Sequence, residues 1–203
     1  MITRVAVILF LLAPVLLLPG STPVHAVDTY VVNWSALESA VLAYLRQPGP
    51  PAADRVLTML PAGHRVSLEG PDYDGQIAEH LWRLSLDLAP LVWRVQPGAL
   101  DVAWALRTIA DGAFLADLNA MIAKPLARHP RTFLRALKRN RSRSDDADAC
   151  AVADGLGIDL VDNPSAQRAE VQARIAALAS VTDPALIAER DCVLTALRAL
   201  PLP

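Results

Sequence analysis

The amino-acid sequence predicts an all-α fold, and three observations support this prediction. Apolar residues recur at helical spacing along most of the chain, Pro and Gly separate these stretches, and no convincing alternation of apolar and polar residues follows Val32. We expect about seven or eight helices and one disulfide in a single domain over residues 27–203. Helix pairs joined by short Pro-rich turns suit either an irregular bundle or a short HEAT-like helical solenoid.

Residues 1–26 have the three parts of a secretory signal peptide. Arg4 supplies the positive charge, an apolar run extends from Val5 to Leu18, and Val24-His25-Ala26 forms a small-residue cleavage site. An uncleaved anchor helix is the alternative, but the apolar run is shorter than the roughly 20 residues that cross a bilayer. We therefore expect a mature protein that begins at Val27, is periplasmic or secreted and has no membrane span.

The first two expected helices are separated by prolines. Ser35 and Glu38 form a capping box at the start of the first helix, which ends at the Pro- and Gly-rich residues 47–51. The second helix covers Ala52–Leu60. The segment Pro61–Tyr73 contains two glycines and two prolines, so we expect a loop there.

The middle of the chain predicts three more helices. Helical spacing of apolar residues begins at Asp74, Pro90 kinks or restarts this helix, and Pro97-Gly98 stops it. The next two helices cover Ala99–Ile109 and Ala113–Ala123, with a break at the residues between them.

The last third of the chain predicts three helices and one long loop. Pro130 is well placed as the first residue of a helix that ends near Asn140. Residues 141–163 are polar and lack helical periodicity, so they are expected to form the longest loop. A helix over Ser165–Ser180 follows, and Asp183-Pro184 opens the final helix, which runs to Leu200.

The two cysteines are Cys150 and Cys192, and both belong to the expected mature chain. In an oxidising compartment an isolated pair predicts a disulfide, with Cα atoms within about 7 Å of each other. The alternative is a pair of free thiols for redox chemistry or metal binding, but no Cys-x-x-Cys motif is present and no His lies near either cysteine. The disulfide would fix the long loop to the last helix.

Three tryptophans, Trp82, Trp93 and Trp104, recur at a spacing of 11 residues. Pro90 and Pro97-Gly98 prevent one continuous helix from carrying all three. We expect each tryptophan to anchor the core of its own helix; the alternative is an aromatic wall on which a sugar ring or a peptide stacks.

No complete catalytic, phosphate-binding or metal-binding motif is present in the sequence, and we expect no cofactor and no metal site. The one cluster with catalytic character lies within residues 69–79 and the histidine that follows. Two carboxylates there could act as acid and base of a small cell-envelope hydrolase. The alternative is a polar loop whose aspartates cap a helix. The candidate residues are Asp72, Asp74, Glu79 and His80.

The strongest charge feature is an interval without acidic residues between Asp117 and Asp145, which holds 8 of the 19 basic residues. On its helix we expect Phe133, Leu134 and Leu137 to be buried and the basic side chains to be exposed. Such a face could bind an acidic protein or an anionic envelope surface, or residues 145–162 could neutralise it. The candidate binding residues are Arg128, Arg131, Arg135, Lys138 and Arg139.

Charge and motifs together favour a binding or interaction protein over an enzyme. Loss of Arg4 with the signal peptide leaves 18 basic and 21 acidic residues, a formal charge of −3, which gives no general attraction to nucleic acid. We expect a helical protein that binds a partner, in the manner of an inhibitor or immunity protein, with the hydrolase as the alternative.

Overall fold

The computed structural model describes residues 29–67, 73–143 and 146–201. The predicted signal peptide and its cleavage site lie outside the described residues, and so do Asp72 and Asp145.

The fold is all-α, as the sequence predicts. In the described residues the α-helices are α1 (Trp34–Arg46), α2 (Pro50–Met59), α3 (Gly75–Trp93), α4 (Ala99–Arg107), α5 (Gly112–Ala123), α6 (Pro130–Asn140), α7 (Asp146–Ala151), α8 (Pro164–Ala179) and α9 (Ile187–Ala199). Short 3₁₀ helices connect some of them: η1 (Lys124–Ala127), η2 (Arg141–Arg143), η3 (Val152–Asp154), η4 (Ile158–Leu160) and η5 (Pro184–Leu186).

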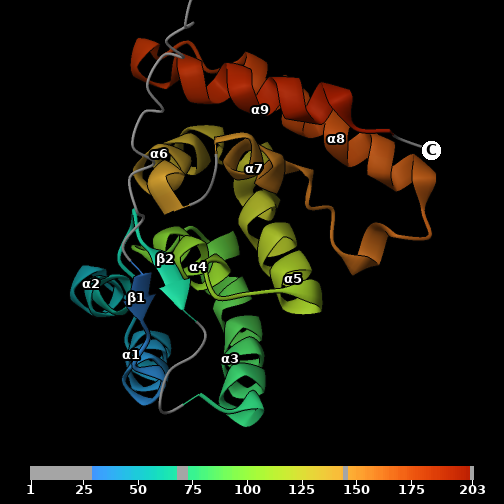
Figure 1. Cartoon of the computed structure of the whole chain (residues 1–203). Helices are drawn as coiled ribbons and strands as arrows, with labels where there is room; N and C mark the ends of the chain where they lie inside the picture. Colours follow the sequence, from blue (N-terminus) through green and yellow to red (C-terminus); the bar gives the residue numbers. More distant parts are fainter. Residues whose placement is uncertain (1–28, 68–72, 144–145, 202–203) are drawn as a thin grey trace, which may run out of the picture.

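The helices form an irregular bundle around α4. Figure 1 shows α1, α2 and α3 at one end of the molecule, α8 and α9 side by side at the other, and α4 to α7 between them. Helix α4 contacts α2, α3, α5 and α6, and every residue of α4 except Asp101 is buried. In a solenoid each repeat contacts only its neighbours, so this central helix identifies a bundle.

The first helix begins one residue earlier than the sequence predicts. The cap of α1 is Asn33, whose Oδ1 accepts a hydrogen bond from the Ala36 N–H at 2.9 Å, so the expected capping box of Ser35 and Glu38 is wrong. Asn is as good an N-cap as Ser. The earlier cap also places Trp34 in the first turn, where its side chain is buried.

Two short strands pair in the structure, and one of them, β2, lies within the expected loop 61–73. Strands β1 (Thr29–Val31) and β2 (Arg65–Ser67) pair in parallel, with Tyr30 opposite Val66. Both of these side chains pack against the core. A three-residue strand is too short to show a period of two in the sequence. For this reason β2 was not predicted, and residues 61–73 were expected to form a loop.

Helix α3 continues through Pro90 and ends at Trp93, without the restart that the sequence left open. The three tryptophans therefore differ in exposure: Trp104 is buried, Trp82 is half-buried, and the side chain of Trp93 is 49% exposed. The expectation that each tryptophan anchors the core of its own helix is confirmed for Trp104 and wrong for Trp93.

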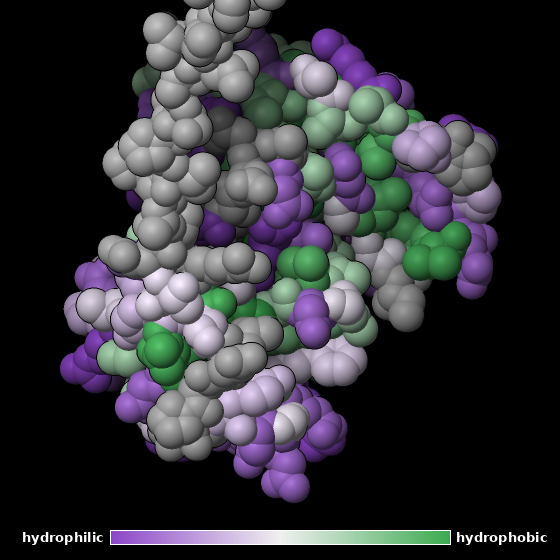
Figure 2. All heavy atoms as spheres, in the orientation of Figure 1, coloured by the Kyte–Doolittle hydropathy of each residue, from purple (hydrophilic) through white to green (hydrophobic). Residues whose placement is uncertain are grey.

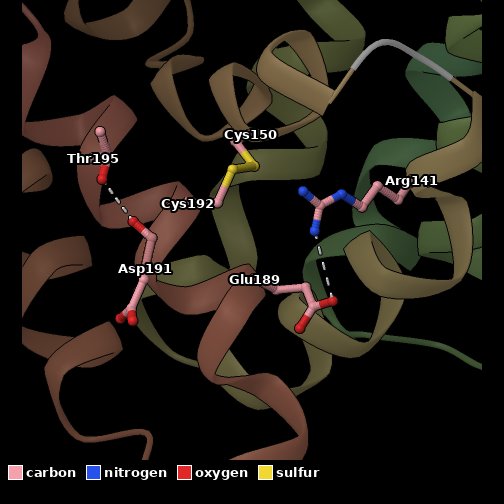
Figure 3. The surroundings of a disulfide bond; sticks show 6 residues. All are labelled: Arg141, Cys150, Glu189, Asp191, Cys192 and Thr195. Atoms are coloured by element: carbon pink, nitrogen blue, oxygen red, sulfur yellow. Dashed lines mark hydrogen bonds and ion pairs between the residues drawn. A yellow bond between two sulfur atoms is a disulfide. The ribbon is translucent and has the colours of Figure 1, made fainter.

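The expected loop over residues 141–163 contains helix α7, and the disulfide forms from it. Cys150 in α7 is bonded to Cys192 in α9, with Cα atoms 5.9 Å apart, which confirms the predicted pairing (Figure 3). Arg141 Nη1 and Glu189 Oε1 lie 4.0 Å apart near this bond. The disulfide therefore joins the middle of the molecule to its last helix.

Arg174 of α8 is a fully buried cation that the sequence does not reveal. It donates hydrogen bonds to the carbonyl oxygens of Ala153 (2.7 Å) and Gly155 (2.8 Å) and to Glu170 Oε1 (3.0 Å). Burial lowers the pKa of Arg174, and Glu170 acts in the opposite direction. These contacts hold the segment after η3 in place.

Within the described residues, every helix is either too short or too polar to cross a membrane.

Candidate functional site

The basic helix has the faces that the sequence predicts. In α6 the side chains of Phe133, Leu134 and Leu137 are buried, and Arg131, Arg135 and Lys138 are exposed. Pro130 stands at the first position of the helix, which ends at Asn140 as expected.

Three of its cations contact acidic or carbonyl groups of other helices. Arg139 pairs with Asp101 of α4 at 2.7 Å, and Arg135 lies 4.0 Å from Asp183. Lys138 Nζ donates a hydrogen bond to the carbonyl oxygen of Ala185 at 2.7 Å. Of these three cations only Arg139 is closely paired with an acidic residue, and that residue lies outside the acidic segment 145–162.

Arg128 and Arg131 remain exposed, with no partner among the described residues. In the acidic segment 145–162, which was the alternative partner for these cations, Asp148 pairs with Arg107 at 2.9 Å. The two cations of this surface without a partner among the described residues therefore lie at its amino-terminal part.

The three candidate catalytic residues that the structure describes, Asp74, Glu79 and His80, each contact a different residue and not one another. Asp74 Oδ1 caps α3 by accepting a hydrogen bond from the Ile77 N–H at 2.7 Å. Glu79 pairs with Arg83, and His80 Nδ1 lies 2.6 Å from Glu38 Oε1. Asp72 lies outside the described residues.

The structure instead brings four aromatic rings to one cavity of about 220 Å³ between α1, α3 and α5, which we call the aromatic cavity. The rings of Trp34 and Tyr73 have centroids 5.1 Å apart, and those of Trp82 and Phe114 are stacked at 6.5 Å. Its lining residues are Trp34, Tyr73, Ala78, Glu79, Leu81, Trp82, Ile109, Asp111 and Phe114.

Polar groups occupy defined places around these rings. Trp82 Nε1 donates a hydrogen bond to Asp117 Oδ2 at 2.9 Å, which fixes the indole. Trp34 Nε1 is buried and has no partner among the described residues. Asp111 stands at the N-cap of α5, yet its side chain makes no cap hydrogen bond, so its carboxylate remains available beside the rings.

No family model matches the chain, and neither does any curated protein or solved structure. The function must therefore be inferred from the residues and geometry of the site.

Metal binding receives no support from the described residues, where no three His, Cys, Asp or Glu side chains are grouped to hold an ion. Of the residues that line the aromatic cavity, the sequence singled out Trp82 and Glu79. It did not reveal Trp34, Phe114 or Asp111, because only the packing of α1 and α5 against α3 brings them together.

Proposed function

We propose that this protein is a periplasmic or secreted binding protein whose aromatic cavity receives a positively charged organic group. The observation that carries the proposal is the grouping of the exposed Tyr73 ring and the half-buried Trp82 ring with two carboxylates, Glu79 and Asp111, around one cavity, above the buried rings of Trp34 and Phe114. The faces of aromatic rings attract cations, and this attraction contributes about 0.5 to 2 kcal/mol as the cation loses water. The disulfide is compatible with an oxidising compartment outside the cytoplasm.

The size of the cavity limits the ligand. Its volume of about 220 Å³ is below the roughly 300 to 1,000 Å³ of pockets for drug-sized molecules. It suits one ammonium or guanidinium group with a short stem, either on a small amine or at the end of a basic side chain of a partner protein.

The carboxylates are placed to accept such a group. Asp111 has no partner among the described residues. Glu79 is paired with Arg83, but both side chains are more than half exposed, and exposed pairs contribute little to stability. A bound cation can therefore compete for Glu79 at small cost.

This geometry supports binding better than hydrolysis. An acid and base pair must both reach the reacting bond, whereas Asp74, Glu79 and His80 each contact a different residue. The hydrolase remains the alternative proposal, and its test is activity that depends on these three side chains.

Calorimetric titration with tetramethylammonium and with L-arginine amide tests the cavity. tert-Butanol, a neutral molecule of similar shape, is the control ligand. We expect both cations to bind, and Tyr73→Ala and Asp111→Asn each to weaken binding by about five-fold. Asp162→Asn removes an exposed carboxylate away from the cavity and is the matched control variant.

Equal binding of tert-butanol, or no binding of either cation at millimolar concentration, contradicts the proposal. Binding of arginine amide alone points to a partner's side chain rather than a small amine.

A second candidate function uses the exposed Arg128 and Arg131. Because these cations have no partner among the described residues, they favour contact with an acidic protein or an anionic envelope surface.

A further inference from the structure

A second hollow on the molecule is larger and more apolar than the aromatic cavity. It consists of two adjoining parts, about 620 and 280 Å³ in volume, which share Asp117, Leu156 and Gly157 in their linings. We call it the α5 groove, because α5 forms its floor, with α3 on one side and residues 151–161 on the other.

Large exposed apolar side chains gather at this groove. Leu86, Trp93 and Val161 line it and are 52%, 49% and 62% exposed. Figure 2 shows hydrophobic residues on this face over α5 and over the segment between α7 and α8. Three large exposed apolar side chains beside one hollow form the kind of apolar patch that is typical of interaction sites, whereas a single one would be ordinary.

One wall of the groove, at Gly155, is held closely against α5. Gly155 packs so closely on α5 that a Cβ there would lie 2.5 Å from the carbonyl carbon of Asn119. Arg174 holds the carbonyl oxygen of Gly155 from the other side. The groove is thus present before a partner arrives, which reduces the cost of ordering on binding.

The charge at the groove is predominantly acidic. Asp117, Asp154 and Asp159 line it, against one cation, Lys124. Asp154 Oδ1 is buried and has no partner among the described residues. Burial raises the pKa of Asp154 although Arg174 opposes this, so a further cation at the groove would stabilise the carboxylate.

We propose that the α5 groove binds a basic amphipathic helix of a partner protein. Apolar side chains of that helix fill the groove between Trp93 and Val161, and Lys or Arg residues along its edge meet the three aspartates. The inference rests on the proposed binding function, which it extends from a single cationic group to a peptide. Trp82 connects the two sites, because it lines the aromatic cavity and donates its hydrogen bond to Asp117 of the groove.

Fluorescence anisotropy with dye-labelled synthetic peptides tests the groove. The first peptide is a helix former with Leu on one face and Lys on the other, the second replaces Lys by Glu, and the third keeps the Lys peptide's composition in scrambled order. We expect the first to bind at least about ten-fold more tightly than the others, and added salt to weaken its binding.

Two pairs of variants locate the binding. Leu86→Ser combined with Trp93→Ser should weaken binding of the Lys peptide by about ten-fold, because it removes the apolar anchors. Val31→Ser changes an apolar residue that is equally exposed but lies outside the groove, and should leave binding unchanged. Asp159→Asn should weaken binding by about two- to three-fold, and Asp162→Asn should not. Circular dichroism confirms that each variant is folded.

The outcomes separate this inference from the proposed function. The proposal that the α5 groove binds a basic helix is overturned if the Glu peptide binds as tightly as the Lys peptide. It is also overturned if Val31→Ser weakens binding as much as Leu86→Ser with Trp93→Ser does. Binding to phosphatidylcholine vesicles through Leu86 and Trp93, without peptide binding, overturns it in favour of a lipid surface. The variant Leu86→Ser with Trp93→Ser should bind tetramethylammonium as tightly as the wild type does. If the wild-type protein does not bind tetramethylammonium, only the proposal for the aromatic cavity is contradicted.

Discussion

Arg139 and Asp101, 38 residues apart in the sequence, form a two-point ion pair between α6 and α4. Arg139 Nε donates to Asp101 Oδ1 at 3.1 Å and Nη2 donates to Oδ2 at 2.7 Å. Asn140 Nδ2 donates to the same Oδ1 at 2.6 Å. Asp101, whose side chain is only 16% exposed, therefore joins the basic helix to the central helix of the bundle.

Replacing Asp101 should destabilise the whole fold. Asp101→Ala leaves three donors without their acceptor, so we expect the free energy of unfolding to fall by about 2 to 3 kcal/mol. Urea denaturation followed by circular dichroism measures the change. Arg131→Ala, which removes an exposed cation with no partner among the described residues, is the control and should change stability by less than about 0.5 kcal/mol. Equal effects of the two variants would show that the ion pair is unimportant.

How much of this region the sequence predicts depends on the range of the interactions. The bounds of α6 follow from local signals, because Pro130 fixes the first turn and the apolar face has a strict helical period. The pairing of Arg139 with Asp101 was not predicted, because the partner lies on another helix and no local pattern identifies it.

The same distinction applies to the rest of the fold and to the candidate site. The disulfide was predicted from the lone cysteine pair. Asp183-Pro184 was expected to open the last helix, but it opens the 3₁₀ helix η5, and α9 begins three residues later at Ile187. Strand β2 and helix α7 were missed, because β2 depends on β1 and α7 is held by Cys192. The aromatic cavity likewise forms only when three helices pack together.

Reversing the two open charges of the basic surface should separate binding from stability. We expect Arg128→Glu combined with Arg131→Glu to leave the melting temperature nearly unchanged, because exposed charges contribute little to folding. If the second candidate function is correct, the same variant loses binding to phosphatidylglycerol-rich vesicles, and salt weakens binding of the wild-type protein. Vesicle flotation measures both effects.

The control for this experiment is Arg135→Glu, which reverses a cation that already lies near Asp183. It should reduce vesicle binding less than the double variant does. If vesicle binding is unchanged after Arg128→Glu with Arg131→Glu, the basic surface is not the binding site.

Gly155 should tolerate no side chain. Its Cβ would lie 2.5 Å from the carbonyl carbon of Asn119 and 2.6 Å from the Ala120 nitrogen, and backbone atoms cannot move aside as a flexible side chain does. We expect Gly155→Ala to lower the free energy of unfolding by about 2 kcal/mol or more.

Gly75→Ala is the matched control, because no atom of the described residues lies within 4 Å of a Cβ built at Gly75, and its stability should equal or slightly exceed that of the wild type. Thermal unfolding of both variants measures the difference. A Gly155→Ala protein of unchanged stability would mean that residues 155–157 are not packed on α5, and the groove would lose its wall.

The buried Tyr44 should make the protein sensitive to alkaline pH. Its hydroxyl donates a hydrogen bond to the carbonyl oxygen of Pro97 at 2.9 Å, next to the start of α4. Burial, with a smaller contribution from Asp101, raises the pKa of Tyr44 from 10.0 to about 12. In the unfolded chain the hydroxyl ionises near pH 10, whereas in the folded protein it keeps its proton until about pH 12. Between these pH values the unfolded state binds fewer protons, so stability falls as the pH rises.

Tyr44→Phe should therefore change stability in opposite directions at neutral and alkaline pH. Below pH 9 the variant loses the hydrogen bond to Pro97 and should be less stable by about 1 kcal/mol. Above pH 10 ionisation of Tyr44 in the unfolded chain destabilises only the wild type. The difference in free energy of unfolding between the two proteins should therefore narrow and reverse at about pH 11. Few other groups titrate in this range, since the chain has only two lysines, Lys124 and Lys138, and two further tyrosines. Urea denaturation of both proteins at intervals from pH 7 to about pH 11 measures the crossing. A constant difference between them across that range would mean that Tyr44 ionises as readily in the folded protein as in the unfolded chain, and that its hydroxyl is not held in the core as the structure shows.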